Sequence, residues 1–117
     1  MPDALPVCTT LAECNARDGT RIAVVGVYRH YPDVPGVDYS EAPRAVRIDL
    51  EDGLGPFLDP FWSPRAIRPR SEIEQHLGQR VRVTGVYHKD MPRNPDDPPQ
   101  ASAMGGPCIE VDALERV

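Results

Sequence analysis

The sequence predicts an all-β domain, a small barrel of five strands with two short helices. Three observations lead to this fold class. A ten-residue pattern occurs twice, as GTRIAVVGVY at residues 19–28 and as GQRVRVTGVY at 78–87. A third stretch, AVRIDLE at 45–51, alternates apolar and charged side chains. A period of two in β-branched residues is typical of strands, so we expect one strand in each stretch.

The two copies of the repeat have matching faces. Alternation places on one face Ile22, Val24 and Gly26 of the first copy and Val81, Val83 and Gly85 of the second. Glycine weakens the interior of a strand. A glycine at the same place in both copies therefore predicts a bulge or bend at which the strand curls around a barrel.

A short helix is expected before each copy of the repeat. TLAE at residues 10–13 and SEIE at 71–74 both fit the capping box, in which a hydroxyl and a carboxylate bind free backbone N–H groups. Gly19 and Gly78 follow these segments, where a helix end favours glycine. The second helix is expected over 71–77, between the third and fourth strands.

The remaining strands are marked by a turn and by prolines. Asp52-Gly53 predicts a tight turn after 45–51. Residues 54–62 contain Pro56 and Pro60, which indicates an irregular or edge strand. A last strand is expected over 107–111. The expected core is Ile22, Val24, Val46, Ile48, Leu50, Leu77, Val81, Val83, Ile109 and Val111.

This order of elements resembles the OB-fold, a five-stranded Greek-key barrel with a helix between its third and fourth strands. The resemblance rests on GTRIAVVGVY, on VRIDLEDG at 46–53 and on HLGQRVRVTGVY at 76–87. It covers residues 10–117 as a single domain and leaves 1–9 as an N-terminal tail. The resemblance implies a binding module but not its ligand, because this architecture carries many unrelated functions. It also places residues 29–43 and 88–106 in the loops that flank the binding face.

Charge is distributed unevenly along the chain. The formal net charge is −5, yet residues 61–89 carry six cations against two carboxylates. This asymmetry predicts one attractive surface on an acidic body; the alternative is a solvated, arginine-rich helix and strand face.

Catalytic and metal-binding motifs are weak. No nucleophile, phosphate-loop or dinucleotide motif occurs, so we expect a protein that is not an enzyme and uses no cofactor. His88, Met91, Met104 and Cys108 bracket one loop with soft ligands that would suit Cu(I). Because they are scattered around that loop, packing is the preferred role for its methionines, and no metal site is assigned.

The three cysteines, Cys8, Cys14 and Cys108, lack the spacing of a zinc site. We expect reduced, buried thiols, with a bridge from Cys8 or Cys14 to Cys108 left open. No apolar run is long enough to span a membrane and no signal-peptide pattern precedes the domain, so the expected location is cytoplasmic. An exported or lipid-anchored form is left open.

The candidate ligand-binding residues are aromatic side chains and arginines: Arg47, Phe57, Phe61, Trp62, Arg65, Arg68, Arg70 and Tyr87. Aromatic rings with arginines suit single-stranded nucleic acid, and the same residue types anchor protein interfaces. Both long loops carry more carboxylates than cations and should repel a polyanion. A protein partner is therefore the first expectation and nucleic acid the alternative, with residues 61–70 as the functional surface. The oligomeric state is not predicted.

Overall fold

The computed structural model describes residues 5–30, 46–60, 63–93, 95–96 and 106–117. The elements follow in chain order: β1 (Val7–Cys8), α1 (Leu11–Asn15), β2 (Arg21–His30), β3 (Val46–Leu50), β4 (Gly53–Leu58), the 3-10 turn η1 (Pro64–Ala66), α2 (Arg70–His76), β5 (Arg80–His88) and β6 (Cys108–Arg116).

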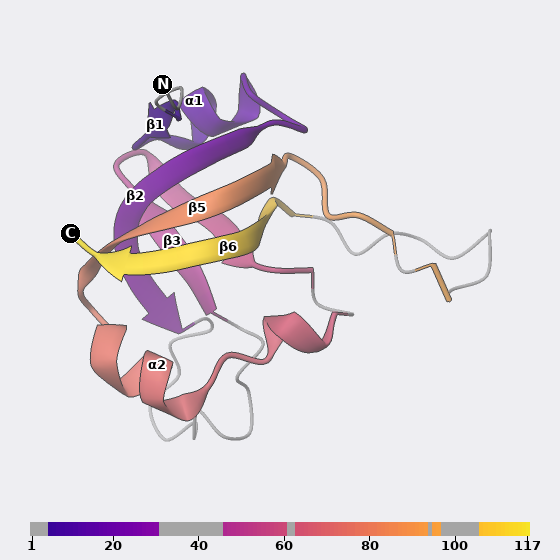
Figure 1. Cartoon of the computed structure of the whole chain (residues 1–117). Helices are drawn as coiled ribbons and strands as arrows, with labels where there is room; N and C mark the ends of the chain where they lie inside the picture. Colours follow the sequence, from indigo (N-terminus) through magenta and orange to yellow (C-terminus); the bar gives the residue numbers. More distant parts are fainter. Residues whose placement is uncertain (1–4, 31–45, 61–62, 94, 97–105) are drawn as a thin grey trace.

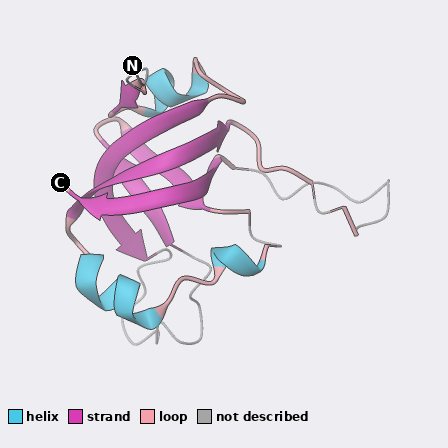
Figure 2. Ribbon diagram, in the orientation of Figure 1, coloured by secondary structure: helices cyan, strands magenta, loops and turns pink. Residues whose placement is uncertain are grey.

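Five strands close into a barrel, which confirms the predicted all-β class. Their order is β2-β3-β4-β6-β5, and pairing of β2 with β5 closes the circle. All these pairs are antiparallel except β4–β6, which is parallel. Helix α1 lies at one end of the barrel and α2 at the other (Figures 1 and 2). This arrangement is compatible with the OB-like barrel that the sequence resembles.

The two repeated glycines stand where the barrel turns. Strand β2 pairs with β5 up to Val27 and with β3 from Val27 onward, so Gly26 adjoins the point where β3 begins to pair with β2. A side chain at Gly26 would collide with the backbone oxygen of Asp49. The β5–β6 register shifts between Thr84 and Gly85, which is the bulge predicted for the second copy.

All ten residues of the predicted core belong to one apolar cluster, in which nine are buried and Leu77 is partly buried. Two tyrosines, Tyr28 and Tyr87, are its largest fully buried side chains. The alternation in the repeats therefore gave the correct strand faces.

Strand β4 corrects the expected edge strand. It pairs with β3 on one side, and on the other side Phe57 and Leu58 pair with Cys108 and Ile109 of β6. Pro56 is tolerated because the β3–β4 register shifts at this point, and a bulged residue needs no ladder hydrogen bond.

Two further local expectations are wrong. The segment assigned to an N-terminal tail contributes β1, whose Val7 and Cys8 pair in parallel with β2. The second capping box does not form, because α2 begins at Arg70 with Pro69 as its N-cap residue and no side-chain cap. Proline at φ −58° is already set for a helix start, so the helix begins before Ser71.

The capping box of α1 forms in modified geometry. The Thr10 hydroxyl accepts a hydrogen bond from the Glu13 backbone N–H at 3.1 Å. The Glu13 carboxylate accepts from the backbone N–H of Thr9, one residue earlier than predicted, at 3.3 Å. The helix is also capped from outside, because the Asp52 carboxylate accepts from the backbone N–H groups of Leu11 at 2.6 Å and Ala12 at 3.2 Å.

Replacing Asp52 by alanine should therefore lower the melting temperature by a few degrees, since two N–H groups of α1 lose their acceptor. The hydrogen bond from Leu11 holds the pKa of Asp52 below its ordinary value. A carboxylate with a depressed folded-state pKa stabilises the fold above its ordinary pKa and ceases to do so as pH falls through the folded value. Thermal melts should show the difference between wild type and Asp52→Ala at pH 7 and its loss in strong acid. A constant difference across that range would contradict the cap.

Candidate functional site

The basic segment predicted as the functional surface is tied into the fold. Its Phe61 and Trp62 lie outside the described residues. The Arg65 guanidinium donates a hydrogen bond to the backbone oxygen of Val111 in β6. Arg70 is exposed and forms an ion pair with Glu74 at 3.0 Å.

Arg68 lies at the centre of a part-buried polar network. Its guanidinium donates to both oxygens of Glu72 at 2.7 Å and to Asp59 at 3.1 Å. The hydroxyl of Tyr28 donates to the same Glu72 carboxylate at 2.8 Å. The Arg68 side chain is only 11% exposed. Because Tyr28 belongs to β2 and Glu72 to α2, the network fastens the helix to the barrel.

Asp59 connects this network to β6. It has a positive φ of 68°, and its side chain is 2% exposed. Its carboxylate accepts from the Val111 N–H at 3.1 Å, and its own N–H donates to the Ile109 oxygen at 2.8 Å. Burial raises the pKa of Asp59, although the Val111 hydrogen bond and the nearby arginines oppose this. Asp59 and Arg68 are therefore mutually satisfied structural groups.

Arg47 and Phe57 come together as predicted neighbours, but neither is well exposed. They face each other across β3 and β4, with the guanidinium 4.4 Å from the ring centroid. The same guanidinium donates to the Gly55 backbone oxygen from two nitrogens, at 3.1 and 2.7 Å. Arg47 is 7% exposed and Phe57 8%. Their packing explains both residues without a ligand.

Tyr87 corrects the predicted aromatic surface, because its side chain is in the core and fully buried. Its hydroxyl donates to the Asn15 side-chain oxygen at 2.5 Å, and burial raises the pKa of Tyr87. The ring cannot stack on a ligand from this position. It was selected because strand alternation was not applied to the last residues of the second repeat, which place Tyr87 on the inward face.

The loop considered for soft metal ligands is also packed. Met91 is buried with Phe57 and Cys108 in a second apolar cluster. His88 lies 2.9 Å from the Glu110 carboxylate. Met104 lies outside the described residues, and the described part of the chain holds no cluster of three His, Cys, Asp or Glu side chains suited to a metal.

The outer side of β2 presents a different candidate surface, which we call the β2 outer strip. Its floor is formed by outward residues of β2, and β5 flanks it; the members are Ala23, Val25, Val27, Arg29, Arg80 and Arg82. Ala23 and Val25 are only 4% and 7% exposed although they lie on the outer face. Apolar residues at outward positions are the sequence signal that could have identified this surface.

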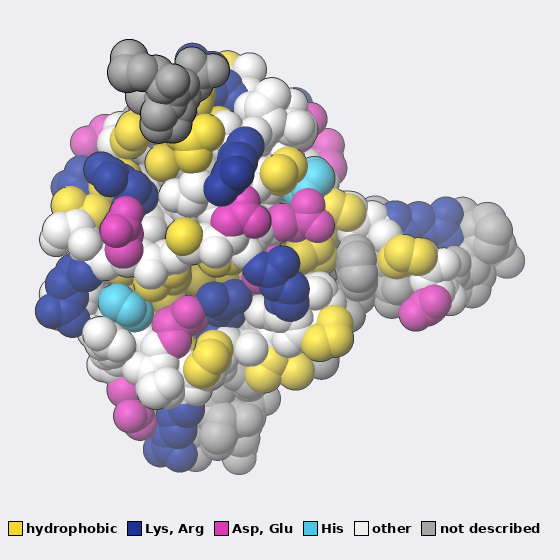
Figure 3. Space-filling model, viewed as in Figure 1, with side chains coloured by type: hydrophobic (Ala, Val, Ile, Leu, Met, Phe, Trp, Pro, Cys, Tyr) yellow, Lys and Arg dark blue, Asp and Glu magenta, His cyan; other side chains and the backbone are white. Residues whose placement is uncertain are grey.

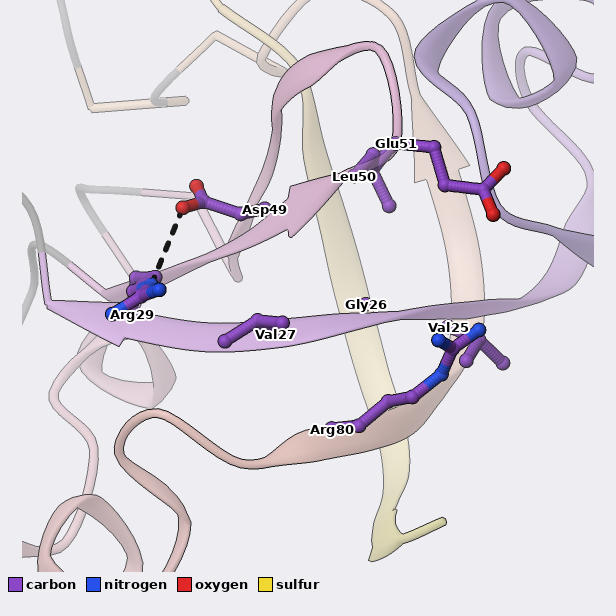
Figure 4. Close-up of a pocket in the computed structure, with 8 residues that line it drawn as sticks. All are labelled: Val25, Gly26, Val27, Arg29, Asp49, Leu50, Glu51 and Arg80. Carbon is purple, nitrogen blue, oxygen red and sulfur yellow. Dashed lines mark ion pairs between the residues drawn. The ribbon is translucent and has the colours of Figure 1, made fainter.

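Two shallow clefts lie on the β2 outer strip. One, of about 180 Å³, is lined by Val25, Gly26, Val27, Arg29, Asp49, Leu50, Glu51 and Arg80 (Figure 4). The other, of about 330 Å³, is lined by Leu5, Val7, Ala23, Arg82, Thr84 and Glu115. Both contain apolar side chains and charges of both signs, a combination typical of protein interfaces.

Charges in the first cleft are partly matched. Arg29 lies 3.4 Å from one Asp49 oxygen, and the other Asp49 oxygen is buried without a hydrogen-bond partner in the described structure. Arg80 makes no ion pair with any described residue and extends over β2 toward Val25 (Figure 4). The cleft therefore offers one cation and one carboxylate oxygen that a partner can satisfy.

Elsewhere on the surface, cations and anions alternate. Ion pairs join Arg21 to Asp112, Arg82 to Glu115 and Arg70 to Glu74. In Figure 3, basic and acidic side chains are interspersed over the visible face and form no continuous basic groove.

The fold and these surfaces define a closed five-stranded β-barrel with two short helices. No family model, curated protein or solved structure matches the chain. Within the described residues, no helix is long and apolar enough to cross a membrane.

Proposed function

We propose that this protein is a non-catalytic OB-like binding module that recognises a protein partner through the β2 outer strip. The observation that carries the proposal is the pair of clefts along one outer face, with an apolar floor and charges of both signs. The apolar floor provides area that a partner can bury. Arg80 and the unpaired Asp49 oxygen supply polar contacts that fix its orientation.

The charge pattern favours protein over nucleic acid. A polyanion gains affinity from cations that are free to neutralise phosphates. Here five arginines (Arg21, Arg29, Arg68, Arg70 and Arg82) already lie in ion pairs. The remaining cations of the predicted basic segment do not form a groove either, because Arg65 bonds to a backbone oxygen.

Matched charge reversals test the site. Arg80→Glu changes the β2 outer strip, while Arg70→Glu changes the segment that the sequence favoured. Both arginines lie at exposed surface positions, so both variants should melt close to wild type. In affinity capture from nuclease-treated extract of the native cells, one protein should bind wild type and Arg70→Glu. With purified components, Arg80→Glu should weaken its binding about tenfold or more.

The outcomes separate the two partner classes. Equal binding by wild type and Arg80→Glu, with loss in Arg70→Glu, would move the site to the basic segment. A fluorescent oligothymidine of about 20 nucleotides should show no micromolar binding in anisotropy measurements. Micromolar binding that weakens steeply between about 50 and 200 mM salt would instead support single-stranded nucleic acid.

A further inference from the structure

Two of the three cysteines lie next to each other in the folded chain. Cys8 is in β1 and Cys14 is in α1, and both belong to the main apolar core. Their thiols are in hydrogen-bond contact. Cys108 is buried in the second cluster with Phe57 and Met91. The fold therefore separates the pairing that the sequence left open, to Cys108, from a pairing within the first fourteen residues.

We propose that Cys8 and Cys14 form a redox-modification site, which closes to a disulfide in the presence of a disulfide oxidant. A disulfide needs its two cysteines already close, because the S–S bond is about 2.05 Å and the Cα separation is narrowly limited. The β1–α1 unit provides this proximity through adjacent elements, without help from the rest of the barrel.

The step balances with oxidised glutathione as the oxidant. The Cys8 sulfur, as thiolate, attacks the glutathione disulfide, forms a mixed disulfide and releases one glutathione thiolate. The Cys14 sulfur, after losing its proton, attacks the Cys8 sulfur and releases the second glutathione. Two protein thiols are oxidised, and one glutathione disulfide is reduced to two thiols.

Burial makes the reaction conditional on local opening. Burial raises the pKa of Cys8 and raises that of Cys14 to about 12. Thiolates are the reactive form, so the closed protein should react slowly. The two-residue β1 and five-residue α1 form the smallest strand–helix unit of the described chain and offer the opening that the reaction requires.

The bond would fix one wall of the proposed binding surface. Val7, which precedes Cys8, lines the larger cleft and is 50% exposed. In the reduced protein β1 is held to β2 by two paired residues only. A covalent link from Cys8 to α1 would restrict the movement of this wall, although the disulfide itself does not depend on the proposed function.

Equilibration of the full chain in glutathione redox buffers tests the site, with acid quench, alkylation in denaturant and peptide mass spectrometry. The expected product links the peptides of Cys8 and Cys14 and leaves Cys108 alkylated. Native protein should form this bond at a less oxidising glutathione ratio than urea-unfolded protein, because the fold holds the thiols together. The oxidised form should melt roughly 5 °C or more above the reduced form.

Alanine variants control for the third thiol and for folding. Cys108→Ala should form the same bond, and Cys14→Ala should form no intramolecular bond and show no melting shift on oxidation. The proposal is overturned if the native chain links Cys108 to either partner. It is equally overturned if both thiols stay reduced in strongly oxidising buffer, or if native and unfolded chains oxidise at the same glutathione ratio.

Discussion

Replacing Arg68 by alanine is expected to lower the free energy of unfolding by about 3–5 kcal/mol, because it leaves Asp59 and Glu72 without their shared cation. The loss is large because both carboxylates lie in the interior side of the network, where water replaces the guanidinium poorly. Small domains are stable by only about 5–15 kcal/mol, so the variant should be close to unfolding at 37 °C. Urea denaturation measures the change.

Arg70→Ala is the matched control, two residues away on the same segment. Its ion pair with Glu74 is exposed on both sides, at 67% and 60%, and such pairs are worth less than about 1 kcal/mol. Equal stability of the two variants would show that Arg68 is a solvated surface arginine. In that event the sequence interpretation, in which Arg65 and Arg68 can be removed with little change in melting temperature, would be correct.

The substitution Val83→Asp is expected to unfold the domain. Val83 is fully buried at the centre of the main core, opposite Val24 and Leu114. A carboxylate there would lose its hydration with no cation to replace it, at a cost of several kcal/mol, comparable with the whole stability of the fold. Circular dichroism in the absence of denaturant should show the loss of strand signal.

Arg82→Ala provides the control for this position. Arg82 precedes Val83 on the opposite face of β5, is exposed, and reaches only Glu115 at 3.8 Å. Its removal should change the melting temperature little. If Val83→Asp folds with the same stability as Arg82→Ala, the inward and outward faces of β5 are assigned the wrong way round.

The sequence predicted the fold because the barrel strands are encoded locally. Alternation of apolar residues identified β2, β3 and β5, and Asp52-Gly53 identified the turn between β3 and β4. The same reasoning failed for β4, because the bulge that accommodates Pro56 depends on its partner strand and is invisible along one chain. It also missed β1, a two-residue strand that exists only through pairing with Ala23 and Val24.

The site was harder to predict, because an arginine has the same appearance in a sequence whether it binds a partner or a neighbouring carboxylate. Arg68 was selected as a ligand residue, and its partners Asp59 and Glu72 lie nine and four residues away. The position of Asp59 against β6 follows from barrel closure, which no local pattern encodes. Conversely, Val25 and Val27 were placed correctly on the outward face, but their use as a cleft floor depends on Arg80 from β5.

Barrel closure is the central claim, because it places Arg68 in its network, Tyr87 in the core and the β2 outer strip on the surface. Solution NMR tests it at the parallel β4–β6 contact. The Phe57 N–H donates to the Pro107 oxygen at 3.0 Å, and the Asp59 N–H donates to the Ile109 oxygen at 2.8 Å. A closed barrel predicts backbone NOEs between residues 57–59 and 107–109 and slow hydrogen exchange of the Phe57 and Asp59 amides. Absence of these NOEs, with both amides exchanging as fast as in an unstructured chain, would contradict the closed barrel.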